Sequence, residues 1–197
     1  MEQNVNIIGI TGMNGAGKTT VASILRKQYY VGYYEVRKFL ECERIKRDLP
    51  EGRDSLVFIA NDLREKFGAD YIMKSLAQKA EKDRGCNPSI IESICCIGEI
   101  EALSERYGDK FVLIGVDAFV ETRYSRVVAR GSQTDNVDLK TFCQQEVREM
   151  SKSDPRKQNL RGCMNLVHKE FLVWNDKTER DLRCQVMNIG KRLNLPC

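Results

Sequence analysis

Short apolar runs alternate with amphipathic segments along this chain of 197 residues. The apolar runs predict buried strands at residues 5–10, 32–36, 89–94, 111–116 and 171–174, of which the second is the weakest. Between them, apolar side chains recur at spacings of three and four, which indicates helices packed against a sheet. This alternation predicts a three-layer α/β/α fold around a five-stranded, mainly parallel sheet.

The predicted helices are placed by their apolar stripes. The first helix follows the first strand and covers residues 18–29. Three later helices carry the stripes Ile100, Leu103, Tyr107; Leu139, Phe142, Cys143, Val147, Met150; and Leu182, Val186, Ile189, Leu193. The last of these opens with residues 178–181, TERD, which can form a capping box.

The turn between the first strand and the first helix contains the most specific motif of the chain. It reads GMNGAGKT over residues 12–19 and fits the P-loop pattern G-x-x-x-x-G-K-[ST]. Glycines let such a loop point its N–H groups at a polyphosphate, and the helix N-terminus adds its dipole. The predicted nucleotide-binding residues are Gly12, Met13, Asn14, Gly15, Ala16, Gly17, Lys18, Thr19 and Thr20. Lys18 would reach the outer phosphates and Thr19 would ligate Mg²⁺, so the motif predicts binding of a nucleoside triphosphate.

Two interruptions of the α/β pattern accompany this motif. Residues 37–83 are helical in pattern, with breaks at 49–52 and 67–68. Small-molecule kinases with a P-loop hold their phosphate acceptor in a helical insertion at this point. Residues 130–137 are polar and predict a short lid between two helices. We expect one kinase domain over residues 1–197.

Composition narrows the class of protein. A hydrophobic content of 42% with 30% charged residues is typical of a soluble globular protein, and no apolar stretch is long enough to span a membrane. The net charge of +4 is too small and dispersed to favour a nucleic-acid surface. The eight cysteines include no C-x-x-C pair, and no signal-peptide pattern is seen. We therefore expect reduced thiols and a cytoplasmic location.

Acidic residues follow two of the predicted strands. Glu92 lies at the carboxyl end of an apolar run, which is the edge where open parallel sheets bind ligands. We predict that it holds Mg²⁺ through water or contacts the acceptor, in preference to capping the next helix. Asp117 has a similar position, but here a cap for the helix from Phe119 is the favoured interpretation.

Three arginines share one face of the helix that leads into the predicted lid. Arg123, Arg126 and Arg130 stand at i, i+3 and i+7. Arginines there can stabilise charge on a transferring phosphoryl group, whereas a solvated basic face is the alternative. We favour the catalytic role for Arg126 and Arg130 and the solvated face for Arg123.

The helical insertion offers candidate contacts to the acceptor. Arg37 and Arg64 could bind a substrate phosphate bidentately, and Tyr71 and Asn61 could orient a base or sugar. Surface ion pairs are an equal alternative for the two arginines.

Several stretches together resemble P-loop kinases of the nucleoside or deoxynucleoside monophosphate kinase-like and dephospho-CoA kinase-like group, some of which are fused to deoxycytidylate deaminase domains. The matching stretches are ITGMNGAGKTT, VRKFL (36–40), ANDLREKFGADYI (60–72), IIESI (90–94), RYSRVVARGSQTD (123–135), EVREMSKSDPRKQNLRGCM (146–164) and WND (174–176). The resemblance implies the adenylate-kinase-like fold and Mg²⁺·ATP as donor. It implies ATP contacts over residues 12–19, acceptor contacts at Arg37 and Arg64, and lid contacts at Arg126 and Arg130.

The chain departs from this family in two places. Relatives often carry an arginine directly after IIESI, where this chain has Cys95, so a cationic contact to the acceptor is missing. The last loop usually reads N-D-G-T but here reads N-D-K-T over residues 175–178. Gln158 and Asn159, by the same resemblance, lie near the hinge of the lid.

These features favour ATP-dependent phosphoryl transfer to a small phosphorylated acceptor, with a (deoxy)nucleoside monophosphate as first choice. Transfer to a ribose hydroxyl of dephospho-CoA is one alternative, with Glu92 as its base. A regulator that binds ATP without turnover is another, because of Cys95. The sequence does not favour a nucleic-acid partner and leaves the oligomeric state open.

Overall fold

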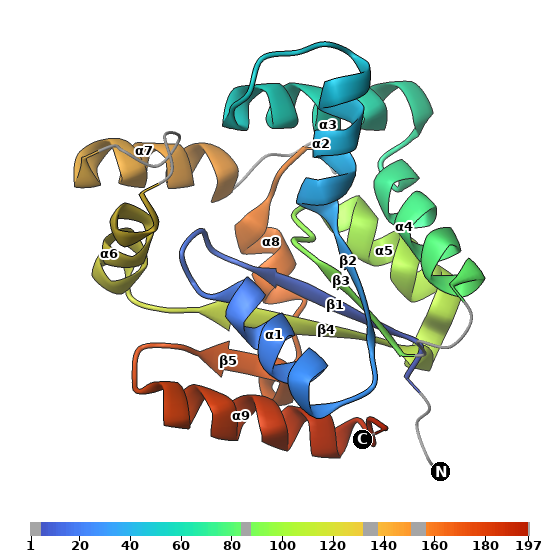
Figure 1. The fold of residues 1–197 in the computed structure, drawn as a ribbon, viewed down its shortest axis with the longest axis vertical. Coiled ribbons are helices and arrows are strands. Elements are labelled where there is room, and N and C mark those ends of the chain that lie inside the picture. The colour runs from blue at the N-terminus through green and yellow to red at the C-terminus, as the bar shows by residue number, and fades with distance from the viewer. Residues whose placement is uncertain (1–4, 84–87, 132–137, 151–156, 197) are drawn as a thin grey trace.

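The computed structural model describes residues 5–83, 88–131, 138–150 and 157–196, and they form a parallel sheet with helices on both faces (Figure 1). The strands lie in the order β2-β3-β1-β4-β5, and every neighbouring pair is parallel. Their bounds are β1 (Ile7–Gly12), β2 (Gly32–Glu35), β3 (Ser89–Glu92), β4 (Phe111–Asp117) and β5 (Leu172–Trp174). The predicted fold class and the number of strands are confirmed.

The core consists of two apolar clusters, one on each face of the sheet. Successive side chains of a strand point to opposite faces. Ile90 therefore packs with α1 (Lys18–Gln28) and α9 (Glu179–Arg192), whereas its neighbour Ile91 packs on the other cluster. That second cluster is covered by helices of the insertion and by α5 (Ile97–Tyr107). Nearly continuous apolar runs in the strands follow from burial on both faces.

Several strand boundaries differ from the predicted ones, and two of these differences concern the strand ends beside the P-loop. β1 runs to Gly12 rather than ending at residue 10, because it pairs with β4 as far as Val116. β3 ends at Glu92 rather than at residue 94, because Ser93 turns the backbone with a φ of 74°. The amides of Ser93 and Ile94 both donate to the carbonyl of Ile10, at 3.0 and 3.1 Å. This turn directs the chain after Glu92 toward the insertion.

The insertion forms three helices, as its pattern predicted. These are α2 (Val36–Lys46), α3 (Arg53–Phe67) and α4 (Tyr71–Lys82), and the breaks between them lie at the predicted places. Figure 1 shows α2 and α3 above the carboxyl edge of the sheet, with α4 beside α5. The insertion therefore lies above the edge of the sheet that follows Gly12 and Glu92.

The predicted lid lies between α6 (Val120–Arg130) and α7 (Leu139–Met150). Gly131 ends α6 in the left-handed conformation with a φ of 61°. Residues 132–137, which make up most of the predicted lid, lie outside the described residues.

The other elements are the last helix, one helix that the sequence did not predict and two single helical turns. The predicted capping box of α9 is confirmed, since Thr178 and Asp181 bond each other's backbone amides. A helix that the sequence did not predict, α8 (Leu160–Asn165), contacts β1, and Asn159 caps it by accepting from the Gly162 amide at 2.8 Å. Two single turns, η1 (Gly108–Lys110) and η3 (Lys169–Phe171), precede β4 and β5. In the part of the chain that is described, no helix is long and apolar enough to cross a membrane.

The two-sided burial of the sheet predicts a large effect of a cavity in β3. Ile90→Ala should lower the free energy of unfolding by about 2 to 5 kcal/mol, because Ile90 is fully buried. Ile45→Ala on α2 is the matched control, since Ile45 is 67% exposed. Urea denaturation followed by circular dichroism measures both. Equal losses in the two variants would contradict this description of the core.

Candidate functional site

The P-loop connects β1 to α1 and has the backbone that its glycines require. Gly15 and Gly17 have φ values of 76° and 100°, where residues with a side chain are strained. A Cβ at Gly15 would lie 2.4 Å from the carbonyl oxygen of Arg123, and one at Gly17 would lie 2.4 Å from Asn175 Nδ2. The two glycines are thus needed both for the turn and for the close approach of α6 and of the loop after β5.

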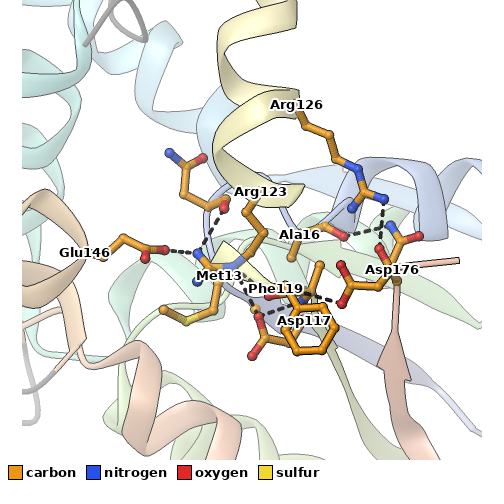
Figure 2. Close-up of polar contacts among 12 residues, drawn as sticks. Met13, Ala16, Asp117, Phe119, Arg123, Arg126, Glu146 and Asp176 are labelled. Atoms are coloured by element: carbon orange, nitrogen blue, oxygen red, sulfur yellow. Dashed lines mark hydrogen bonds and ion pairs between the residues drawn. The ribbon is translucent and has the colours of Figure 1, made fainter. Parts of the chain in front are cut away.

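Side chains from outside the P-loop bind its carbonyls. Asn175 Nδ2 donates to the carbonyl of Ala16 at 2.8 Å, and Arg123 Nη1 donates to that of Asn14 at 3.4 Å (Figure 2). Arg126 Nη2 in turn donates to the carbonyl of Asn175 at 2.8 Å. Two of the three arginines of α6 therefore support the loop, directly or through Asn175.

Arg123 is buried, so the prediction of a solvated basic face is wrong for this residue. Its side chain is 5% exposed and donates from Nε to the carbonyl of Ala118 at 2.9 Å. It also forms an ion pair with Glu146 of α7 and a longer one with Asp117, at 3.4 Å from Nε to Oδ1. Figure 2 shows Arg123 between these carboxylates and the P-loop. Side chains of α7 therefore reach this part of α6, since Glu146 pairs with Arg123 and Phe142 lies beside it.

Asp117 does not cap α6, which corrects the second prediction for this region. α6 begins at Val120, and no side chain caps its N-terminus. The Asp117 carboxylate accepts from the amide of Ala118 at 2.8 Å and faces Arg123. Burial raises the pKa of Asp117, against the lowering effects of that amide and of Arg123.

Two buried polar atoms close to the P-loop have no partner. Among the described residues, Arg126 Nη1 and Asp176 Oδ1 are the buried side-chain atoms of this kind. The other carboxylate oxygen of Asp176 accepts from the amide of Phe119 at 2.8 Å. Buried donors and acceptors are nearly always paired, so this donor and acceptor suit a polar ligand seated on the loop.

Glu92 lies beside Thr19 of the P-loop, where the strand register places it. It stands opposite Ile10 of β1, and its Oε1 accepts from Thr19 Oγ1 at 2.6 Å. Its other oxygen, Oε2, accepts a hydrogen bond from the hydroxyl of Tyr33 on β2. Burial, and then the Glu92 carboxylate, raise the pKa of Tyr33, so this hydroxyl stays protonated. A hydroxyl beside a carboxylate provides the oxygen donors that Mg²⁺ prefers.

The predicted acceptor residues line one cavity of about 210 Å³ next to the P-loop. Arg37, Asn61 and Arg64 lie on its wall together with Lys18 and Arg130. Gln158, Ser93 and Cys95 also line it, with apolar contacts from Leu40, Leu56, Val57, Ile94 and Leu160. Lys18 Nζ donates to the carbonyls of Gly12 and Met13 at 2.9 and 3.0 Å, which places its charge at the end of the cavity nearest the loop.

Arg64 combines a position in this wall with a buried ion pair. It is 1% exposed, and its Nη2 lies 2.7 Å from Oε1 of Glu99, which is fully buried. Burial lowers the pKa of Arg64, but Glu99, Cys95 and Cys96 together more than offset this and the net shift is upward. The guanidinium is held rigidly by Glu99, so it is a fixed positive charge in the wall and not a surface ion pair.

Sequence analysis missed several residues that support the site, and three of them contact it from other parts of the chain. Tyr33, Glu146 and Asn175 make their contacts across 59, 23 and 159 residues of chain, respectively. Asn175 lies in the WND stretch, which provided a signal, but the pattern did not indicate the P-loop carbonyl as its partner. Nothing in the local sequence of Tyr33 or Glu146 distinguishes them from ordinary helix or strand residues.

Residues 8–153 match a protein family described as AAA domain. The chain belongs to this family. A UPF0200 protein of Methanocaldococcus jannaschii is 28% identical over 93% of this chain and 88% of its own length. A UPF0200 protein of Pyrobaculum aerophilum is 29% identical over 74% of this chain and 78% of its own.

Solved structures of other proteins share the fold of this chain. The protein TT1252 from Thermus thermophilus superposes with a TM-score of 0.58, at 19% identity over 96% of this chain and 98% of its own. Shikimate kinase from Bacteroides thetaiotaomicron has a TM-score of 0.55, at 13% identity over 96% and 99% of the two chains. The chain therefore shares its fold with these two proteins, one of which is a kinase.

The buried charges of α6 predict that Arg123 is essential for stability. Arg123→Met should lower the free energy of unfolding by about 3 to 5 kcal/mol, because Asp117 and Glu146 then lose their buried cation. Arg130→Met, the same change on the same helix, should cost at most about 1 kcal/mol because Arg130 is exposed. Denaturant titration of both variants measures the difference. Similar losses of unfolding free energy in the two variants would contradict the buried ion pairs described for Arg123.

Proposed function

We propose that this protein transfers the γ-phosphoryl group of ATP to a small phosphorylated acceptor, with a (deoxy)nucleoside monophosphate as the preferred class. The observation that carries the proposal is the cavity that joins the P-loop residues Gly12, Asn14 and Lys18 to Arg37 and Arg64 of the insertion. Donor and acceptor phosphates bound at its two ends would meet in line beside Lys18.

The chain's own residues supply position and charge. Lys18 and Arg130 stabilise negative charge on the transferring group, and Arg126 holds the loop of Asn175 against the P-loop. Arg37 and Arg64 bind the acceptor phosphate, and Asn61 orients the rest of the acceptor. Arg64 is suited to this because Glu99 fixes its guanidinium before any ligand binds.

Thr19 and Glu92 would hold Mg²⁺, Thr19 through its hydroxyl and Glu92 through water, from the end of β3. When bound, the metal would neutralise charge on the phosphates of ATP. Tyr33 keeps Glu92 in place through its hydroxyl.

The surroundings of Glu92 favour a phosphorylated acceptor over a ribose hydroxyl. A hydroxyl acceptor needs a base, and Glu92 was the candidate. Both of its carboxylate oxygens already accept hydrogen bonds, from Thr19 and from Tyr33. A phosphate acceptor is ionised before it binds and needs no base, so it suits this site better than dephospho-CoA does.

A coupled assay of ADP formation tests the function. The protein is incubated with Mg²⁺·ATP and a panel of NMPs, dNMPs and dephospho-CoA, with Lys18→Ala as the blank. We expect ADP that depends on a monophosphate acceptor and falls by at least about a hundredfold in the blank. Arg37→Gln should raise KM for that acceptor and leave KM for ATP unchanged, because Arg37 lies at the acceptor end.

Three results would contradict the proposal. ADP formation at the same rate without any acceptor identifies an ATPase. ADP formation with dephospho-CoA alone identifies transfer to a hydroxyl. ATP binding, measured by calorimetry, with no ADP formation above the blank identifies a regulator that binds ATP without turnover.

The metal role of Glu92 predicts a changed requirement for Mg²⁺. Glu92→Gln should raise the Mg²⁺ concentration for half-maximal activity by about ten- to a hundredfold, as loss of an outer-shell carboxylate does at metal sites. Tyr33→Phe, which removes one hydroxyl from the same carboxylate, should raise it by a smaller factor. A Mg²⁺ titration at constant ATP measures both variants. If the Mg²⁺ concentration for half-maximal activity is unchanged in Glu92→Gln, Glu92 is not part of the metal site.

A further inference from the structure

Two adjacent thiols lie where β3 leads into α5, at the wall of the acceptor cavity. Cys95 lines the cavity, whereas Cys96 is fully buried behind it. Arg64 Nη2 donates to Cys95 Sγ at 3.4 Å. The sulfur atoms of Cys95 and Cys96 and a carboxylate oxygen of Glu99 all lie within 4.8 Å of one another. The charge of Arg64 on this cluster disfavours a bound cation and favours an anion on sulfur.

Charged and titratable groups from three helices face Cys95. Arg64 approaches from α3, Glu99 from α5 and Cys163 from α8. Glu99 is compensated, because Oε1 accepts from Arg64 and Oε2 from the amides of Cys95 and Cys96, at 3.1 and 3.2 Å.

These neighbours give the two adjacent thiols different roles in the hydrogen bond that joins them: Cys95 accepts it and Cys96 donates it. A hydrogen bond from the Cys96 thiol and the charge of Arg64 lower the pKa of Cys95, although burial and Glu99 oppose them. The same hydrogen bond and burial raise the pKa of Cys96, which remains the protonated donor.

We propose that Cys95 is a nucleophilic modification site that small anionic electrophiles reach through the acceptor cavity. The thiolate of Cys95 attacks the electrophilic carbon, an Sγ–C bond forms, and the leaving group departs with its electron pair. With iodoacetate the product is a carboxymethyl thioether and the leaving group is iodide. No oxidant and no proton donor is needed for this step.

The charge of the cavity explains the preference for an anionic reagent. Lys18, Arg37, Arg64 and Arg130 line it, and a cleft lined by one sign of charge concentrates ions of the opposite sign. An ordinary exposed thiol has no such surroundings. Cys42 on α2 and Cys184 on α9 are exposed and provide internal references in the same molecule.

The test compares iodoacetate with neutral iodoacetamide at single-cysteine resolution. Peptide mapping by mass spectrometry gives the rate of modification at Cys95 and at Cys42 with each reagent. The ratio of the iodoacetate rate to the iodoacetamide rate should be about tenfold higher at Cys95 than at Cys42 in low salt, and should fall as salt is added. Equal ratios at the two cysteines, or no reaction at Cys95, would overturn the proposal.

Two variants test the cause of that preference. Arg37→Gln removes a cavity charge without touching the buried pair of Arg64 and Glu99, and should lower the ratio at Cys95 by about threefold. Arg64→Lys removes the donor to Cys95 Sγ and should slow the reaction with both reagents. Lysine replaces arginine here so that Glu99 keeps a cation. If neither variant changes the rates, the cavity charges do not activate Cys95.

The consequence for turnover rests on the proposed function. A carboxymethyl group on Cys95 lies in the acceptor cavity, so it should abolish acceptor-dependent ADP formation while ATP binding persists. Cys95→Ser should lose no activity on treatment, relative to its own untreated rate. If the protein forms no acceptor-dependent ADP at all, the proposed function fails, but the alkylation ratio still decides whether Cys95 is the predicted site.

Discussion

Two backbone carbonyls of the P-loop, those of Asn14 and Ala16, take hydrogen-bond partners from outside the loop, and this requirement organises the site. A loop that turns its N–H groups toward a polyphosphate leaves carbonyls facing the protein, where an unpaired one costs free energy. The side chain of Asn175 donates to the carbonyl of Ala16, and that of Arg123 donates to the carbonyl of Asn14. The loop after β5 and the helix α6 must therefore pack directly on the P-loop, and Gly15 and Gly17 leave the space for them.

The helical insertion depends on a second buried interaction. Arg64 of α3 and Glu99 of α5 form an ion pair that is almost entirely removed from solvent. Glu99 also accepts hydrogen bonds from the amides of Cys95 and Cys96, which directly precede α5. The same carboxylate therefore fixes the start of a helix and the direction of an arginine. This part of the cavity wall therefore belongs to the core, and the positive charge of Arg64 is held in one position.

Much of this structure follows from local pattern. Apolar runs located every strand, and the combination of strand, glycine-rich turn and helix located the P-loop, because these signals lie within a few residues of one another. The strand register then brings Glu92 to Thr19. The partners of Arg123 could not be predicted in this way. Helical spacing places arginines on one face of a helix, but it does not predict that Glu146 of α7 pairs with one of them.

Arg123 connects the P-loop to α7, through its hydrogen bond to Asn14 and its ion pair with Glu146. Nη1 of the guanidinium donates both to the carbonyl of Asn14 in the P-loop and to the carboxylate of Glu146 on α7, the helix that follows the polar stretch after Gly131. A movement of either part changes the bonds available to the other. If the P-loop binds phosphate as proposed, and this binding depends on the position of α7, then a ligand that shifts α7 changes the phosphate affinity, and thermodynamic reciprocity requires phosphate to change the affinity for that ligand by the same factor. A single nitrogen of Arg123 would then couple the P-loop to a helix that touches no part of the phosphate.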